Sequence, residues 1–219
     1  MARRCTGSEW FQRPDRGSSL MAHSQLLSSE ERLFCYRWFH SLLAKELSEP
    51  QLQALQAGQF ASFFALLAEL GFQPQVTDLQ NELAKLTAYD SPRLELAADF
   101  AQCFLLEGKL SALPYASYYL DERDLSENLA VMDQWLTKFQ LKINRLHNEP
   151  SDHLCIYLEV LIKLIETEQP VQVQQQFIRQ QLLGWLPQWA EKTAQIHSST
   201  AFYQIISNLL LGFLQQDIA

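Results

Sequence analysis

Residues 154–165, with the sequence LCIYLEVLIKLI, are apolar on nearly every side once they are wound into a helix. The main interruptions are Glu159 and Lys163. A surface helix carries one apolar stripe, whereas a helix that is apolar all round must be covered on every side by other elements. No window of the chain reaches 18 uninterrupted apolar residues, so the sequence predicts no transmembrane span. The run therefore predicts a central helix inside a bundle.

The rest of the apolar composition also favours helices. The 219 residues include 38 Leu and 20 Ala but only 5 Val. Leucine and alanine are good helix formers, whereas β-branched residues prefer strands. With 7 Gly and 8 Pro, the chain has too few turn residues for a turn-dense β fold. We predict an all-α fold, a bundle of about nine or ten helices.

Capping residues, prolines and glycines place the ends of these helices. Ser28 and Glu31 form a capping-box pattern at the start of one helix. Prolines in first turns and glycines after last turns mark other ends. Residues 109–124 show no helical period. The predicted helices span residues 29–47, 50–58, 60–70, 77–88, 92–107, 126–143, 151–165, 171–183, 187–196 and 199–216.

The chain divides at a short polar segment, residues 144–150. We predict an N-terminal helical subdomain over residues 25–143, a hinge over 144–153 and a C-terminal helical subdomain over 154–219. Residues 1–24 lack apolar periodicity, so we expect a disordered leader, native or added to the native chain. The two halves must bury their apolar faces on each other, within one chain or between two. We therefore expect both a monomer and a domain-swapped homodimer.

The charge of the chain is acidic and unevenly placed. The net charge is -8, although residues 1–20 carry four arginines against Glu9 and Asp15. The acidic remainder argues against nucleic acid or an anionic membrane as a partner and favours a basic ligand. A need to keep the protein soluble would also account for the acidic charge. No apolar export segment follows the pair Arg3-Arg4, so we expect a cytoplasmic protein.

The sequence lacks the motifs of common enzymes. It contains no phosphate-binding glycine loop, no nucleophile elbow and no zinc-protease motif. Its cysteines, Cys5, Cys35, Cys103 and Cys155, have neither metal-ligand nor redox spacing. The last three lie in apolar helical patterns, which favours buried thiols. We expect no catalysis, no metal site and no cofactor.

Polar residues gather where the central helix begins. His147, Glu149, Pro150, Asp152 and His153 lie in the segment HNEPSDH. Proline, serine and aspartate are common at a helix start, so one interpretation is a purely structural cap. The other is that carboxylates and imidazole meet at the hinge and bind a basic or polar ligand.

Aromatic residues crowd the segment LPYASYYLDE at 113–122. One interpretation is that Tyr115, Tyr118 and Tyr119 pack a loop against the core. The alternative is that they form the wall of a groove. The rim of that groove would carry Asp121, Glu122 and Asp124.

The pattern E-P-x-D-H at 149–153 resembles the hinge motif of the TorD/DmsD-like chaperones, the cytoplasmic maturation factors of exported molybdoenzymes. The resemblance runs from residue 25 to the end of the chain and is nearest to the TorD branch, which serves trimethylamine N-oxide reductase. Tyr115 stands where DmsD-type members usually have tryptophan. Three further segments resemble family motifs in the same order: Asp99-Phe100 with Phe104-Leu105, Pro114-Tyr115-x-Ser117-x-Tyr119-Leu120, and Leu186-Pro187-x-Trp189.

This resemblance implies an all-helical, non-catalytic chaperone that binds the twin-arginine signal peptide and the apo form of a molybdoenzyme. It implies assistance in molybdenum cofactor insertion and a delay of export until insertion is complete. Weak guanine-nucleotide binding is also associated with the family, although no residue of this chain predicts it. The resemblance also implies a signal-peptide site, made of the residues that match the family's motifs. In this sequence they are Asp99, Phe100, Phe104, Pro114, Tyr115, Glu149, Pro150, Asp152 and His153.

The acidic charge and the aromatic segment support this implication independently of the resemblance. An acidic protein with an aromatic groove complements a peptide that has an arginine pair and an apolar stretch. Two other functions stay open: a helical scaffold or regulator that binds folded partners, and a small hydrolase that uses Asp152 and His153. The hydrolase would lack a serine, cysteine or metal partner at a recognisable spacing.

Overall fold

The computed structural model describes residues 27–141 and 151–219, and these residues adopt the predicted all-α fold. Within these ranges no strand occurs, although an isolated β-bridge joins Tyr115 to His153. None of the described helices is long and apolar enough to cross a membrane. The α-helices are α1 (Ser29–Leu43), α2 (Glu49–Gln56), α3 (Ala61–Leu67), α4 (Gln73–Lys85), α5 (Pro92–Phe104), α6 (Glu122–Lys138), α7 (Leu154–Glu166), α8 (Val171–Phe177), α9 (Leu186–Ala194) and α10 (Phe202–Asp217), and short helical turns are η1 (Ala68–Phe72), η2 (Leu86–Ala88), η3 (Ala116–Tyr118) and η4 (Ile178–Leu182).

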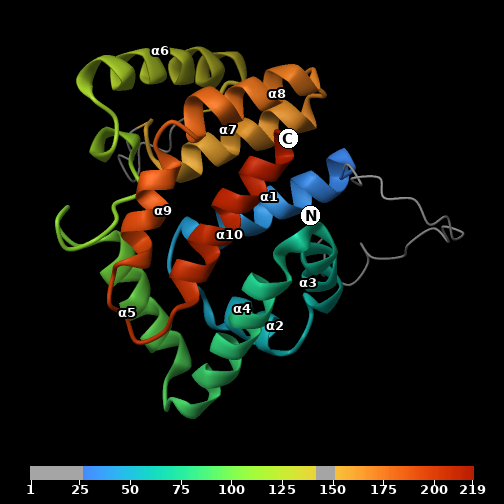
Figure 1. Ribbon diagram of the computed structural model, residues 1–219, viewed down its shortest axis with the longest axis vertical. Coiled ribbons are helices and arrows are strands. Elements are labelled where there is room, and N and C mark those ends of the chain that lie inside the picture. The colour runs from blue at the N-terminus through green and yellow to red at the C-terminus, as the bar shows by residue number, and fades with distance from the viewer. Residues whose placement is uncertain (1–26, 142–150) are drawn as a thin grey trace, which may run out of the picture.

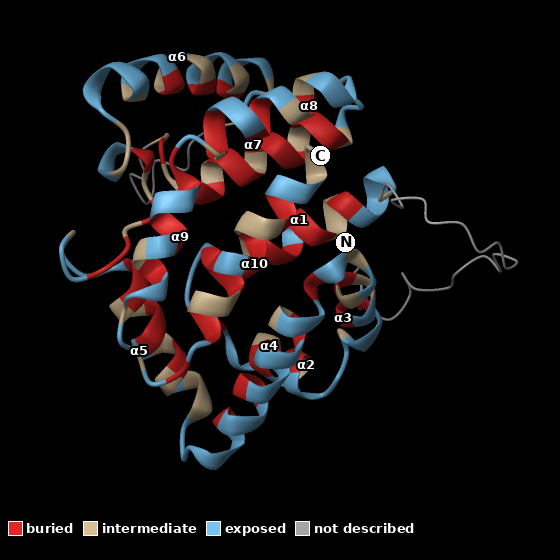
Figure 2. Cartoon of the chain, viewed as in Figure 1, coloured by how far each residue is buried: buried red, intermediate tan, exposed pale blue. Residues whose placement is uncertain are grey.

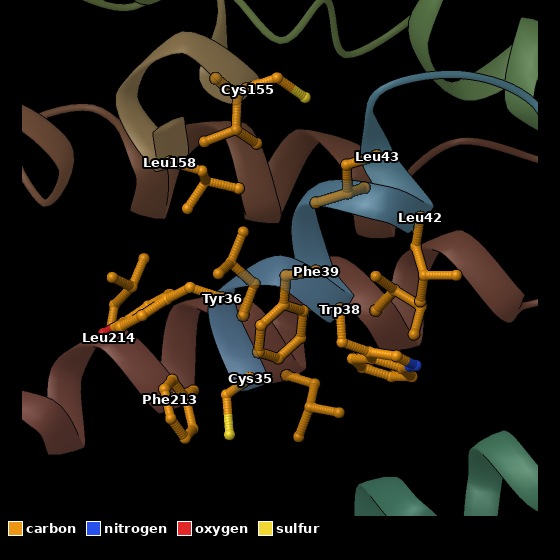
Figure 3. Packing of buried hydrophobic residues seen from close by; sticks show 14 of the residues in the cluster. Cys35, Tyr36, Trp38, Phe39, Leu42, Leu43, Cys155, Leu158, Phe213 and Leu214 are labelled. Carbon is orange, nitrogen blue, oxygen red and sulfur yellow. The ribbon is translucent and has the colours of Figure 1, made fainter. Parts of the chain in front are cut away.

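The predicted central helix is α7. Its apolar side chains are buried on almost every side, and α1 packs along it (Figures 1 and 2). Figure 3 shows Tyr36 and Phe39 of α1 among side chains of α7 and α10. The ring of Phe213 in α10 lies 5.3 Å from that of Tyr36 and 5.8 Å from that of Phe39, centroid to centroid. The core thus joins helices from the beginning, the middle and the end of the chain.

The two predicted subdomains share this core. Helix α10 packs against α4 and α5 as well as against α9, and buried residues from both halves form one hydrophobic cluster. The division into residues 25–143 and 154–219 stays a prediction. The predicted leader lies outside the described residues, as does most of the predicted hinge.

Several helices begin where the capping residues and prolines of the sequence predict. The Ser28 hydroxyl accepts the Glu31 N–H at 3.2 Å, and the Glu31 carboxylate accepts the Ser28 N–H at 2.8 Å. This reciprocal pair confirms the capping box at the start of α1.

Two other helices begin four residues earlier than predicted. Helix α4 begins at Gln73, because Pro74 suits a first turn and Gly71, with φ of 98°, has already ended the preceding helical segment. Helix α6 begins at Glu122, because the Asp121 carboxylate caps its first turn. In both cases the prediction began the helix at a later polar residue and did not use Pro74 or Asp121 to place the start.

Candidate functional site

Two segments that are distant in the sequence meet at the start of α7. Residues 114–118 run beside residues 152–154, and the isolated β-bridge joins Tyr115 to His153. The rings of these two residues meet edge to face, with centroids 4.9 Å apart. We call the two segments together the 115–153 junction.

Backbone and side-chain hydrogen bonds hold the junction closed. The Leu154 N–H donates to the Pro114 carbonyl at 2.8 Å, and the Ala116 N–H donates to the Asp152 carbonyl at 3.0 Å. The carboxylate of Asp152, which is buried, also accepts the Ser117 N–H at 3.1 Å. A charge-assisted hydrogen bond of this kind is stronger than a neutral one. Asp152 therefore fixes the backbone that presents Tyr115.

The residue that caps α7 is His153. Its Nδ1 accepts the Cys155 N–H at 3.2 Å, and the helix begins at the next residue. Of the two interpretations of this segment, the one in which Asp152 caps the helix does not hold for its carboxylate, which accepts the Ser117 N–H instead. Since Nδ1 is an acceptor, the neutral imidazole carries its proton on Nε2.

A buried polar layer lies behind the junction. The Tyr157 hydroxyl donates to the Asn128 side-chain oxygen at 2.6 Å, and the Asn128 amide donates to the Gln181 carbonyl at 3.2 Å. Burial raises the pKa of Tyr157, and the negative charge of Asp152 adds to this shift. The phenol therefore stays a neutral donor, and the layer ties α6, α7 and η4 together behind the site.

Asp99, another predicted site residue, lies inside the bundle. Its carboxylate accepts the backbone N–H groups of Ser199 at 2.7 Å and Thr200 at 2.8 Å. It also accepts the Thr200 hydroxyl at 2.6 Å. Asp99 therefore holds the loop that leads into α10.

Phe100 and Phe104 are buried beside Asp99. Their ring centroids lie 5.4 and 5.5 Å from that of Tyr203 in α10. Phe104 also stacks on Trp189 at 5.9 Å, and the Trp189 indole donates to the Ala112 carbonyl at 3.0 Å. The structure thus connects Phe104 to the chain just before the junction through Trp189. A role of the Phe100 and Phe104 rings in binding the signal peptide stays a prediction.

The structure brings part of the predicted site together. Glu149 and Pro150 lie outside the described residues. Sequence reasoning missed the partner of Asp152, because a backbone N–H such as that of Ser117 leaves no mark in the sequence. The predicted site residues that meet at the junction are Pro114, Tyr115, Asp152 and His153.

The described cysteines are buried, as predicted. Burial raises the pKa of the Cys35 and Cys103 thiols to about 12, and Cys155 is buried as well. Among the residues that the structure describes, no group of three or more histidine, cysteine or acidic side chains is placed to hold a metal ion.

Comparisons with known proteins agree with the motifs. A family model described as the nitrate reductase delta subunit matches residues 68–191. The chain is 56% identical over 189 residues to "Chaperone protein TorD" of Actinobacillus succinogenes, a match that covers 86% of this chain and 97% of the relative. It is 48% identical to the protein of that name from Aggregatibacter aphrophilus, covering 88% and 91% of the two chains. The corresponding Vibrio parahaemolyticus protein is 36% identical, covering 87% and 94%. The chain therefore belongs to the TorD family of chaperones.

Proposed function

We propose that this protein is a cytoplasmic chaperone that binds the twin-arginine signal peptide and the apo form of an exported molybdoenzyme. Trimethylamine N-oxide reductase is the expected client. The chaperone would keep the client competent for molybdenum cofactor insertion and delay its export until insertion is complete. The relatives named above are chaperones, which supports a non-catalytic role.

The observation that carries this proposal is the 115–153 junction. Tyr115 and His153 are half-buried and lie next to the buried carboxylate of Asp152. An arginine side chain can stack its guanidinium on an aromatic ring while it donates to a carboxylate or carbonyl oxygen. The junction therefore offers the groups that an arginine-containing peptide requires.

Rigidity supports the same function. The junction is held by three hydrogen bonds between its two segments, and the buried polar layer supports it from behind. A site that is fixed before binding loses little conformational entropy when the ligand arrives. Once bound there, the arginine pair would be covered and kept from the export machinery, which explains how binding would delay export.

A purified apo precursor of trimethylamine N-oxide reductase provides the test. We expect the chaperone to bind the precursor, and to bind it much more weakly when the two signal-peptide arginines are changed to glutamine. That control keeps the length and the apolar stretch of the peptide. Equal affinity for both precursors would contradict a role for the arginine pair, and no binding to either would contradict the proposed client.

We also propose that the protein occurs as a monomer and as a domain-swapped dimer. The extensive contact between α1 and α7 joins the two predicted halves, so the same contact could form between chains. Size-exclusion chromatography of each isolated species, repeated after mild acid treatment, would show whether they exchange. One monomeric peak under every condition would contradict the proposal.

A further inference from the structure

Helix α10 belongs to the predicted C-terminal half of the chain, yet groups of the N-terminal half contact it along its whole length. It lies in the middle of the molecule, beside α1, α4 and α5 (Figure 1). The N-terminal half contacts it at its start, at its middle and at its end. Together these three contacts fix the position and the direction of α10.

Two carboxylates of the N-terminal half hold the start of α10. Asp99 of α5 accepts the Thr200 N–H at 2.8 Å, and Glu82 of α4 accepts the Ala201 N–H at 3.0 Å. Both acidic side chains are buried. The start of a helix has free N–H groups and a partial positive charge, so carboxylates suit it. The start of α10 is therefore held by side chains of the other half.

The middle of α10 fits the N-terminal half by its shape. A Cβ atom placed on Gly212 would lie 2.9 Å from the ring of Phe72, the last residue of η1. This ring is buried, and its centroid lies 6.4 Å from that of Phe213. A glycine lets α10 approach the ring closely, because a larger residue would have to displace the ring or the helix. The contact therefore fixes the rotation of α10 about its own axis.

A buried ion pair holds the end of α10. The Arg32 guanidinium of α1 donates to both oxygens of the Asp217 carboxylate, from Nε at 2.7 Å and from Nη2 at 2.8 Å. The Tyr36 hydroxyl donates to the same carboxylate at 2.5 Å, and Nη1 of the arginine donates to the Gln174 side-chain oxygen of α8 at 2.6 Å. The two charged side chains are only 8% and 10% exposed. Loss of either charge would therefore leave the other buried and unpaired.

Each member of this ion pair lies at the end of its own helix that disfavours its charge. Arg32 lies near the start of α1, where the helix dipole favours an anion. Asp217 is the last residue of α10, where the dipole favours a cation. Neither charge stabilises its own helix, and both are stabilised by the contact between the halves. The two residues are 185 positions apart. This arrangement indicates that the pair serves recognition between the halves.

We propose that α1, α4, η1 and α5 form a docking surface for α10 of a second copy of the chain, in place of its own, and that the Arg32–Asp217 pair selects the α10 that docks. This inference rests on the proposed monomer and domain-swapped dimer, and it names the contact that decides which halves combine. In a swapped dimer, Arg32 of each copy pairs with Asp217 of the other. Chains in which one charge of the pair is reversed should therefore direct the assembly.

The experiment mixes two full-length variants, Arg32→Asp and Asp217→Arg. In a monomer or a homodimer of either variant, like charges meet at the pair, whereas a swapped heterodimer restores both pairs. The two chains carry different tags, are unfolded together in urea and refolded, and their dimers are counted by native mass spectrometry. We expect the heterodimer to exceed either homodimer by more than about tenfold, against about twofold for random pairing, because contact between like charges suppresses the wrong partners.

A second mixture gives an answer even where the single variants fail to fold. It combines the wild type with the reversed chain, Arg32→Asp with Asp217→Arg, whose monomer keeps opposite charges at the pair. A heterodimer of these two chains would bring like charges together twice, so we expect less than about a tenth of the random yield. The matched control mixes Arg37→Glu with Glu166→Arg, which reverse an exposed ion pair between α1 and α7. Because an exposed pair contributes little, this mixture should stay within about twofold of random pairing.

The outcomes separate this inference from the proposed dimer. If the wild type forms dimers but the charge-reversed chains pair at random in both mixtures, the inference is wrong and the proposed dimer stands. Selection of equal strength in the control mixture would also overturn the inference, because any charge between the halves would then suffice. If the wild type and every mixture stay monomeric, both the inference and the proposed dimer are wrong. Circular dichroism checks that each chain keeps its helices.

Discussion

Asp99 and Asp152 are both buried aspartates of the predicted site, yet the structure surrounds them differently. Asp99 is buried, and its carboxylate accepts three hydrogen bonds from Ser199 and Thr200 in the loop before α10. Asp152 lies beneath the surface, where it accepts the Ser117 N–H beside the half-buried ring of Tyr115.

We infer from this difference that Asp99 supports the fold, whereas Asp152 supports a binding surface. At Asp99, the neighbouring rings of Phe100 and Phe104 are buried. At Asp152, the fixed backbone leads directly to the half-buried rings of Tyr115 and His153. A buried carboxylate is therefore no sign of a binding site by itself, and its neighbours decide its role.

The largest effect should come from Asp99→Asn. The asparagine amide would place donors where the carboxylate now accepts, leaving a buried N–H of the loop before α10 unsatisfied. We expect a loss of about 3 kcal/mol in the free energy of unfolding, measured by urea denaturation.

Asp90→Asn, at an exposed position, is the control and should change stability by less than about 0.5 kcal/mol. Where Asp99→Asn is still folded, its affinity for an arginine-pair peptide should equal that of the wild type. A clear loss of affinity in the folded variant would break the comparison, because it would place Asp99 in the binding site.

Asp152→Asn should have a smaller effect on stability and a larger one on binding. The asparagine oxygen can still accept the Ser117 N–H, so we expect a loss of about 1–2 kcal/mol in unfolding free energy. Removing the negative charge should weaken binding of an arginine-pair peptide about tenfold. Asp133→Asn on the exposed face of α6 is the control. Wild-type affinity with reduced stability would make Asp152 a structural residue like Asp99.

The sequence predicts the parts of this molecule that depend on near neighbours. Ser28 and Glu31 of the capping box are three positions apart, and the all-round apolar pattern of residues 154–165 is enough to place α7 at the centre. In each case the physical cause lies within one segment, so the pattern is visible before the fold is known.

The contacts that distinguish the two aspartates are long-range. Asp152 and Ser117 are 35 positions apart, and Asp99 and Thr200 are 101 positions apart. An aspartate before a helix is a good cap in general, which explains why capping was one of the two interpretations of Asp152. Only the fold shows that a distant N–H competes for its carboxylate and leaves the cap to His153.

His153 allows its structural and binding roles to be separated. His153→Ala removes the cap of α7 and should cost about 1 kcal/mol of unfolding free energy. His153→Asn restores a capping side chain and should recover most of that loss, yet neither variant can place an imidazole against Tyr115. Both should therefore weaken peptide binding equally. Recovery of binding together with stability in His153→Asn would show that the cap alone matters.

The smallest effect concerns pH and the buried thiol of Cys103, which feels the charge of Asp99. Burial, followed by the charge of Asp99, raises the pKa of Cys103 from 9.0 to about 12. The folded chain therefore keeps a proton that the unfolded chain loses above pH 9. The contribution of this thiol to stability is fully present below that pH and is lost as the pH rises toward 12.

Between about pH 8.5 and 9.5, this single thiol should reduce the free energy of unfolding by about 0.7 kcal/mol. Urea denaturation across this range should show a steeper loss for the wild type than for Cys103→Ala, which has no thiol to titrate there. Other buried groups contribute equally to both proteins and cancel in the difference. Parallel losses would mean that solvent reaches Cys103, and the Asp99 region would then be as open as the junction at Asp152.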